Sequence, residues 1–355
     1  MASAPTGHKE KNMKALVYHG PRDLKYEEIP TPVPKKGEVL VKVRAVSICG
    51  SDLSGYKGGS AMRIAPLVMG HEFSGEIAAL GEGVSGMKPG DRVGVVTNLY
   101  CGKCQDCKDG LQNVCDNRYI IGTTMKAGGY NGAMADYVIA PAEKIMSLPG
   151  HVSFNECALV EPLSISLRAT KHLGDIKGKT AAVFGSGPIG LMAIMCLKSF
   201  GVSKIIAIDV LDNRLAMAKQ CGATDGVNSN GDVPAEVRKL TGGLGVDIVF
   251  DAAGVPATVN TGIEIVRNGG TMMLVGMASP KMEIEYKHAV VKELKLLTSY
   301  MYTTEMREGL QMIADGKLDV KRMITSVLPM SDGPRIFEEL AGGKSNEIKV
   351  VLTND

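Results

Sequence analysis

The sequence predicts a mixed α/β protein with two domains, a partly closed β-barrel and a doubly wound parallel sheet. Its 355 residues exceed one ordinary domain, so two hydrophobic cores are expected. Up to about residue 153, short strand-like runs alternate with turns rich in glycine and proline. Beyond that point strand-like and helical segments alternate, which is typical of a doubly wound sheet.

The composition excludes several classes of partner. The formal net charge is +2 and no run of like charges occurs, so neither nucleic acid nor an anionic membrane is expected to bind. No apolar run approaches the roughly 20 residues that span a bilayer, and the N-terminus lacks the charged-then-apolar pattern of a signal peptide. We therefore expect a cytoplasmic protein that does not bind membranes.

The first half of the chain has the pattern of the β-barrel. Residues 1–12 are polar and without periodicity, which predicts a disordered tail. The expected barrel strands are the short runs at 14–18, 38–46, 76–80, 92–96 and 136–139.

The second half has the pattern of the parallel sheet. Buried strands are expected at 180–184, 204–209, 246–251 and 271–275. Crossover helices are expected at 188–200, 213–220, 234–240 and 257–266. After about residue 292 we expect a strand at 294–299, helices at 305–314 and 333–340, and a closing strand at 348–352. A closing strand needs a sheet to join.

Four cysteines form one short array. Cys101, Cys104, Cys107 and Cys115 have the spacing C-x2-C-x2-C-x7-C. Four thiolates in one loop fit a closed tetrahedral zinc site, in which the metal holds structure and does no chemistry. The alternative is two disulfides, which would suit a small secreted domain better than this large chain, whose other four cysteines are scattered singly.

A glycine motif follows the apolar strand at 181–184. It reads Gly185-Ser186-Gly187-Pro188-Ile189-Gly190, a G-x-G-x-x-G that opens an apolar helix. Gly185 permits a tight turn, Gly187 lets the backbone approach a pyrophosphate, and Gly190 lets helix and strand pack closely. The helix N-terminus then receives the phosphate charge.

An acidic residue completes this motif. Asp209 ends the next strand, 19 positions after Gly190, where a carboxylate binds both hydroxyls of an adenosine ribose and repels a 2′-phosphate. NAD is therefore favoured over NADP. Two alternatives stay open, because Asp209 could instead cap a helix and Arg214 could accommodate a 2′-phosphate or stack on adenine.

A second group of metal-binding side chains lies near the N-terminus. Cys49 follows the strand at 39–46, and His71-Glu72 follow the apolar run at 66–69. A thiolate, an imidazole and a carboxylate can hold a catalytic zinc and leave one position open. Taken singly, Cys49 could be a small buried residue and His71 a hydrogen-bonded core histidine.

Together these motifs resemble the zinc-dependent medium-chain alcohol and polyol dehydrogenases over nearly the whole chain. The resemblance implies a discontinuous GroES-like catalytic barrel made of 13–157 and 293–355, and a Rossmann NAD-binding domain at 158–292. It also implies a homodimer or homotetramer, in which a sheet edge near 271–276 could pair across a dimer. One catalytic and one structural zinc per chain would follow.

The resemblance also implies roles at the catalytic zinc. Cys49 and His71 would be ligands, and either Glu72 or Glu161 would be the third. Zinc would lower the pKa of the substrate hydroxyl, and the substrate carbon would give hydride to nicotinamide. Ser51 would relay the alcohol proton and Asp52 would orient His71.

The substrate is expected to be a small secondary alcohol or polyol, including sugar-alcohol phosphates, that gives a ketone. Tyr56 and Tyr302 lie where family members build substrate pockets, although both could serve in core or interface packing. Met301 stands where sorbitol dehydrogenases tend to place an arginine. Two alternatives remain, a threonine-type amino-alcohol dehydrogenase and a non-catalytic NAD-binding structural or sensory protein.

Overall fold

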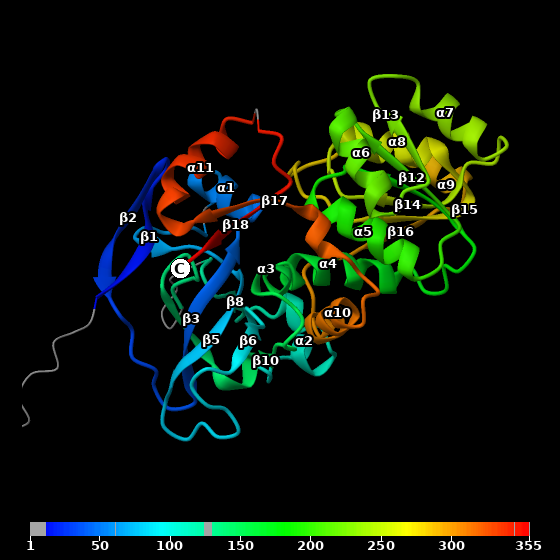
Figure 1. Ribbon diagram of the computed structural model, residues 1–355. Coiled ribbons are helices and arrows are strands. Elements are labelled where there is room, and N and C mark those ends of the chain that lie inside the picture. The colour runs from blue at the N-terminus through cyan, green and yellow to red at the C-terminus, as the bar shows by residue number, and fades with distance from the viewer. Residues whose placement is uncertain (1–11, 61, 124–129, 344, 355) are drawn as a thin grey trace, which may run out of the picture. The chain divides into compact units, whose positions relative to one another are not determined.

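The computed structural model describes residues 12–60, 62–123, 130–343 and 345–354 (Figure 1). The tail predicted at 1–12 lies outside the described residues except for Asn12, which begins strand β1 (Asn12–Gly20). The chain divides into two compact units. The described parts of Met1–Leu99, Asn117–Ala158 and Ser326–Asp355 form the first unit, and Tyr100–Asp116 and Leu159–Thr325 form the second.

A seven-stranded sheet forms most of the first unit. Its order is β10-β6-β5-β3-β18-β17, with β9 also paired to β3, and a smaller sheet has the order β2-β1-β4. The five predicted barrel strands are confirmed. The bounds are β2 (Asp23–Pro30), β3 (Glu38–Ser47), β4 (Leu67–Val68), β5 (Glu72–Leu80), β6 (Arg92–Val95), β9 (Tyr137–Pro141), β10 (Ile145–Ser147), β17 (Ile324–Pro329) and β18 (Lys349–Thr353).

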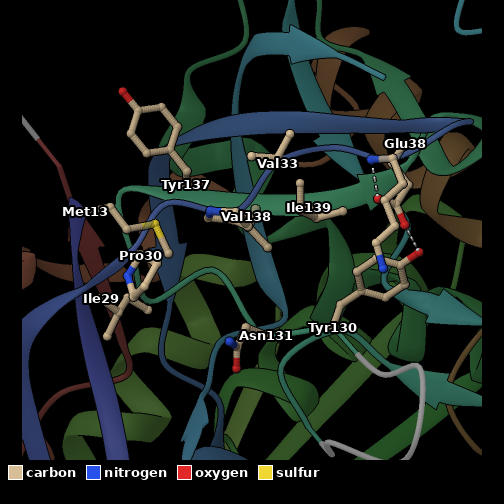
Figure 2. A pocket seen from close by; sticks show the side chains of 12 residues that line it. Met13, Ile29, Pro30, Val33, Glu38, Tyr130, Asn131, Tyr137, Val138 and Ile139 are labelled. Carbon is tan, nitrogen blue, oxygen red and sulfur yellow. Dashed lines mark hydrogen bonds between the residues drawn. The ribbon is translucent and has the colours of Figure 1, made fainter. Parts of the chain in front are cut away.

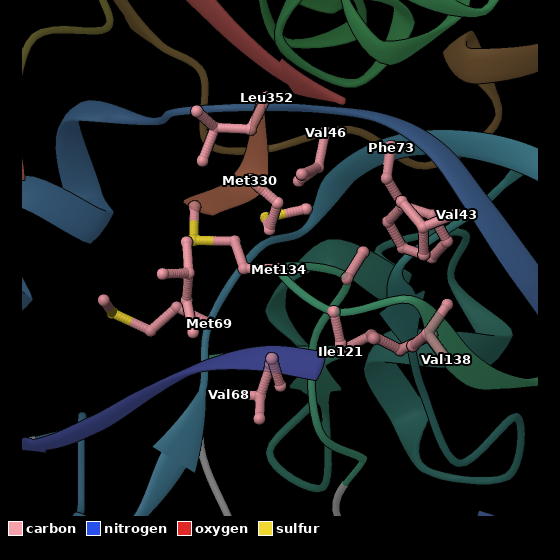
Figure 3. Close-up of a cluster of buried hydrophobic side chains, with 14 of the residues drawn as sticks. Val43, Val46, Val68, Met69, Phe73, Ile121, Met134, Val138, Met330 and Leu352 are labelled. Atoms are coloured by element: carbon pink, nitrogen blue, oxygen red, sulfur yellow. The ribbon is translucent and has the colours of Figure 1, made fainter. Parts of the chain in front are cut away.

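The closing strand joins this unit from the far end of the chain. β18 pairs antiparallel with β3, with Val351 opposite Ser47. Buried side chains from both sheets and from the C-terminal segment share one core, which includes Phe73, Met134 and Leu352 (Figure 3). Burial of this apolar surface is what holds the two distant parts of the sequence in one sheet.

Short helices accompany the sheets of the first unit. They are α1 (Gly50–Tyr56), α3 (Phe154–Ala158) and α11 (Gly333–Ala341), with single turns η2 (Ala142–Lys144) and η4 (Met330–Asp332). α1 begins directly after β3, with Cys49 as its N-cap. The Cys49 thiol accepts the Ser51 amide N–H and the Asp52 carboxylate accepts the Cys49 amide N–H, a reciprocal cap that fixes the start of the helix.

The second unit contains the predicted doubly wound sheet. Its six parallel strands have the order β13-β12-β11-β14-β15-β16, the 3-2-1-4-5-6 order of dinucleotide-binding folds. The strands are β11 (Thr180–Phe184), β12 (Lys204–Asp209), β13 (Asp225–Asn228), β14 (Val246–Asp251), β15 (Val266–Leu274) and β16 (Lys295–Thr298). The helices are α4 (Val160–His172), α5 (Pro188–Ser199), α6 (Asp212–Cys221), α7 (Val233–Leu240), α8 (Pro256–Ile265), α9 (Tyr286–Val291) and α10 (Glu305–Ala314), with one turn η3 (Val320–Met323).

The edges of this sheet differ from expectation. β16 pairs in parallel with Thr271–Leu274 of β15, so the prediction that the chain near 271–276 forms a sheet edge is wrong. The pairing also places β16 in the same sheet as 158–292, and the second unit continues to Thr325. At the other edge β13 was not predicted, because the Asp, Gly and Asn within it favour turns over strands.

The four-cysteine segment Tyr100–Asp116 belongs to the second unit. It contains α2 (Gln105–Lys108) and η1 (Gln112–Val114), and a two-stranded ladder of β7 (Asn98–Leu99) and β8 (Tyr119–Ile120) adjoins it in sequence. The side-chain amide of Asn113 donates to the Tyr300 carbonyl at 2.7 Å, which anchors the segment. Of the helices that the structure describes, none is both long and apolar enough to cross a membrane.

Candidate active site

Three of the predicted ligands meet in the first unit. The ligand atoms of Cys49, His71 and Glu72 all lie within 4.8 Å of one another. The sheet register explains this, because Ser47 at the end of β3 is opposite Glu72 at the start of β5. Cys49 therefore follows the end of β3 at the place where His71 precedes the start of β5.

Asp52 contacts both sides of this cluster. One carboxylate oxygen lies 3.5 Å from His71 Nδ1, and the other accepts the Cys49 amide N–H at 3.2 Å. Asp52 and His71 are both buried. With Nδ1 facing a carboxylate, Nε2 is the ring nitrogen that His71 can offer to a cation.

The two carboxylate oxygens of Glu72 have different surroundings. Its Oε2 lies 2.5 Å from Lys349 Nζ and accepts the Ser47 hydroxyl, whereas Oε1 has no hydrogen-bond partner among the described residues. The carboxylate and the ammonium are 1% and 2% exposed. A buried carboxylate oxygen without a donor is costly, and a metal ion is one group that could satisfy it.

The electrostatics of Cys49 fit the same interpretation. Burial raises the pKa of its thiol to about 12, and the Glu72 carboxylate adds to the rise while Lys349 opposes it. A divalent cation acts in the opposite direction, because a coordinating thiol gives up its proton. The Ser51 hydroxyl lies 3.3 Å from Cys49 Sγ. Thiol, imidazole and carboxylate together suit zinc better than a hard cation.

Two buried cations of this region were not predicted. Arg63 pairs with Asp52 at 2.7 Å, and Lys349 pairs with Glu72. Arg63 lies 11 positions after its partner and Lys349 comes from the closing strand. The sequence implies that buried carboxylates need counter-charges, but it contains no local signal for which residues supply them.

The remaining predicted site residues have other surroundings. Glu161 is buried in the first turn of α4, in the second unit, and its role as a zinc ligand stays a prediction. Tyr56 is buried, donates to Glu338 Oε2 at 2.7 Å and packs edge-on against Phe337, whose ring centroid is 5.5 Å away. Tyr302 is fully buried. These surroundings favour packing for both tyrosines, and their substrate roles stay predictions.

The four-cysteine array forms a compact cluster. All four sulfur atoms lie within 4.8 Å of one another, and Cys115 Sγ is 3.6 Å from Cys101 and 3.7 Å from Cys104. A disulfide needs about 2 Å between sulfurs. A tetrahedron with bonds of about 2.3 Å to zinc has edges of about 3.8 Å, which fits the cluster. The amides of Lys103 and Cys104 lower the pKa of the Cys101 thiol to about 6, whereas burial raises the pKa of the Cys107 thiol to about 12. A bound zinc would deprotonate both thiols.

The glycine motif has the predicted geometry. Gly185 has a φ of +84°, Gly187 caps α5, and Pro188 and Ile189 open the helix. A Cβ atom on Gly190 would lie 1.7 Å from the Gly185 carbonyl oxygen, so only glycine permits this turn. Backbone N–H groups at the N-terminus of α5 suit the negative charge of a pyrophosphate.

Asp209 is fixed beside this turn at the end of β12. Its carboxylate accepts the Ser186 amide N–H at 2.7 Å and the Leu211 amide N–H at 3.0 Å. Leu211 is the N-cap of α6, so Asp209 does not cap that helix. The Arg214 guanidinium lies 3.5 Å from the Ser186 carbonyl oxygen, which places it over the same turn.

One surface pocket of the first unit lies away from the metal cluster. Figure 2 shows this pocket of about 300 Å³, in which the Tyr130 hydroxyl donates to Glu38 Oε1 at 2.8 Å. No predicted site residue lines it. Its lining residues include none of the metal cluster, so the pocket does not contribute to that site.

Comparison with known proteins agrees with this geometry. Residues 35–150 match the alcohol dehydrogenase GroES-like domain, and residues 188–315 match the zinc-binding dehydrogenase family. Sorbitol dehydrogenase from Bacillus subtilis is 34% identical over 347 residues, which cover 96% of this chain and 97% of the relative.

Two solved structures are also similar. An alcohol dehydrogenase from Escherichia coli CFT073 in complex with NADH is 29% identical, with a TM-score of 0.89, and the match covers 97% of this chain and 99% of that one. A zinc-binding dehydrogenase from Sinorhizobium meliloti 1021 bound to NADP is 29% identical, with a TM-score of 0.89, covering 97% and 100%. The chain therefore belongs to the zinc-type medium-chain alcohol and polyol dehydrogenase family, oxidoreductases that act on CH–OH groups.

Proposed function

We propose that the protein oxidises a secondary alcohol or polyol to the ketone, with transfer of hydride to NAD. The observation that carries this proposal is the buried cluster of Cys49, His71 and Glu72, in which one carboxylate oxygen has no donor among the described residues. Such a donor set binds zinc through three protein ligands and leaves a position for substrate.

The side chains around the cluster have separate tasks. When bound, zinc supplies the Lewis acid that lowers the pKa of a substrate hydroxyl, and NAD supplies the hydride acceptor. The exposed Ser51 hydroxyl, 3.3 Å from Cys49 Sγ, is close enough to accept a proton from a hydroxyl held at the cluster. Asp52 orients His71. The position of Glu72 Oε1 supports Glu72 as third ligand, with Glu161 as the alternative.

We infer NAD as the coenzyme. Asp209 is held by two backbone amides, so its carboxylate cannot easily turn away from an adenosine ribose. A fixed negative charge there accepts hydrogen bonds from the 2′- and 3′-hydroxyls and repels a 2′-phosphate. One relative binds NADH and another NADP, so the inference of NAD rests on this carboxylate, with Arg214 over the same turn as the residue that could instead accommodate a 2′-phosphate. The second unit would be the coenzyme domain and the first the catalytic domain.

The proposed substrate class is small polyols, including their phosphates. The sorbitol dehydrogenase relative matches nearly the whole chain, which supports a polyol. We also propose that the protein works in the cytoplasm, because a four-cysteine zinc site needs thiols that stay reduced.

A homodimer is the proposed assembly, paired through β16 in place of the segment near 271–276. β16 is the last strand of the parallel sheet and its Leu296 is 42% exposed. An uncovered strand edge of this kind is suited to pairing with a second copy.

Absorbance of NADH tests the function directly. The purified protein is incubated with NAD or NADP and a panel of sorbitol, xylitol, galactitol, butanediol, threonine, simple alcohols and sugar-alcohol phosphates, with and without a chelator. We expect chelator-sensitive reduction of NAD by a polyol. Turnover of threonine alone would establish the amino-alcohol alternative, and absence of both turnover and NAD binding would contradict the proposal.

A further inference from the structure

Arg63 is a buried arginine whose guanidinium bonds to three separate groups. Its side chain is 3% exposed. Nη2 donates to Asp52 Oδ1 at 2.7 Å and to Ser51 Oγ at 3.3 Å, and Nη1 donates to the Gly122 carbonyl. Buried arginines are rare, and one is retained only where its donors are used.

Two of these contacts lead directly to candidate zinc ligands. Asp52 lies 3.5 Å from His71 Nδ1 and accepts the Cys49 amide N–H. Ser51 Oγ lies 3.3 Å from Cys49 Sγ. One guanidinium therefore holds both of the side chains that contact Cys49 and His71.

The third contact reaches the backbone beside His71. Gly122 has a φ of +75°, and a Cβ atom on it would lie 2.5 Å from the carbonyl oxygen of Gly70. Gly70 directly precedes His71, so the chain at Gly122 packs against the segment that presents the imidazole. The stem of Arg63 is itself confined, because a Cβ atom on Gly55 would lie 2.5 Å from Arg63 Cγ.

We propose that Arg63 is a positioning residue, which sets the geometry of the zinc ligands and of the Ser51 hydroxyl. The inference rests on the proposed function and goes beyond it. Arg63 keeps Asp52 in place against His71 and occupies one acceptor site of Ser51, which leaves the Ser51 proton directed toward Cys49 Sγ. The planar fork reaches these acceptors from two nitrogens, Nη1 and Nη2, whereas a lysine carries all its donors on one nitrogen and lacks the fixed fork geometry.

The test measures zinc affinity separately from turnover. Arg63→Gln, Arg63→Lys and wild type are equilibrated with a zinc-buffering chelator, and bound zinc per chain is measured by elemental analysis. We expect Arg63→Gln to weaken one of two zinc sites by about 10–100-fold and to lower kcat/KM, mainly through kcat, by a similar factor. Arg63→Lys should recover zinc affinity only in part.

Arg44→Gln is the matched control. Arg44 pairs with Glu76 Oε2 at 2.7 Å in the same unit and is half-buried. The substitution removes an arginine–carboxylate pair from the same sheet, and we expect the zinc affinity of both sites and the turnover to stay as in wild type. If Arg63→Gln does not fold, Arg63→Lys carries the test, and zinc affinity and kcat equal to wild type in that variant would overturn the inference.

The outcomes separate this inference from the proposed function. Weaker zinc binding by Arg63→Gln supports the inference whether or not a substrate is found, because zinc affinity needs no substrate. Active wild type together with unchanged zinc affinity and kcat in Arg63→Gln would overturn the inference and leave the proposed function standing. Equal zinc loss in Arg44→Gln would also overturn it.

Discussion

Removing Lys349 should destabilise the first unit strongly. Its Nζ lies 2.5 Å from Glu72 Oε2 and donates to the Ile48 carbonyl at 3.0 Å, and both charged groups are at most 2% exposed. Lys349→Met keeps the apolar stem and removes the ammonium, so among the described residues only the Ser47 hydroxyl still donates to the buried Glu72 carboxylate. Breaking a buried pair in this way costs about 3–5 kcal/mol.

The expected loss is large enough to measure by thermal unfolding. For a unit of this size each kcal/mol lowers the midpoint by about 2–4 °C, so the zinc-stripped variant should unfold about 6–20 °C below wild type. With zinc present the loss should be smaller, because a cation near Glu72 supplies part of the missing counter-charge. The assay is therefore run with chelator and with saturating zinc.

Two control variants separate the mechanism from a general effect of losing a lysine. Lys171→Met removes an exposed pair with Glu308 and should cost at most about 1 kcal/mol. The variant with Glu72→Gln and Lys349→Met removes both buried charges and should recover most of the loss. A midpoint shift in Lys349→Met no larger than that of Lys171→Met would refute the reasoning.

Four other perturbations have defined outcomes. Cys104→Ser should release one zinc per chain and lower the thermal midpoint, because structural zinc contributes folding energy. Unchanged zinc content would contradict the assignment of a structural zinc site to the four cysteines. Asp209→Gly should raise KM for NAD by about 10–100-fold, the value of lost hydrogen bonds to a charged group, and improve use of NADP; an unchanged coenzyme ratio in steady-state kinetics would contradict it. Ser51→Ala should keep its zinc and lose about 10²–10⁴ in kcat, and full turnover would exclude Ser51 from proton transfer. Burial alone would raise the pKa of Glu305, but the amides of Thr303 and Glu305 and the Arg168 guanidinium hold it below its usual range. Glu305→Gln should therefore destabilise the protein at pH 7, and the difference should vanish as the pH falls through the lowered folded-state pKa; a pH-independent difference in urea unfolding would contradict this.

The local patterns of the sequence predicted most of the fold. The barrel strands, the glycine turn and the cysteine cluster were predicted because each depends on periodicity or spacing within a short segment. The short strand β13 was missed because its Asp225-Gly226-Val227-Asn228 favours turns, and it is held in the sheet by parallel pairing with β12.

The long-range parts of the site could not be predicted. Lys349 begins the apolar run of β18, where a lysine would ordinarily face solvent, and only the pairing of β18 with β3 brings it to Glu72. The burial of Arg63 similarly depends on Gly122, which is distant in sequence. Tyr56 was expected near substrate from its position after Cys49, but its hydroxyl pairs with Glu338 on α11.

Zinc content and turnover of Cys49→Ser test the central claim most directly. The account predicts about two zinc ions per chain in wild type and about one in the variant, because the four-cysteine site is separate from the cluster of Cys49, His71 and Glu72. The variant should fold, bind NAD and lack polyol-dependent formation of NADH. A Cys49→Ser protein that keeps both zinc ions and full turnover would contradict the account.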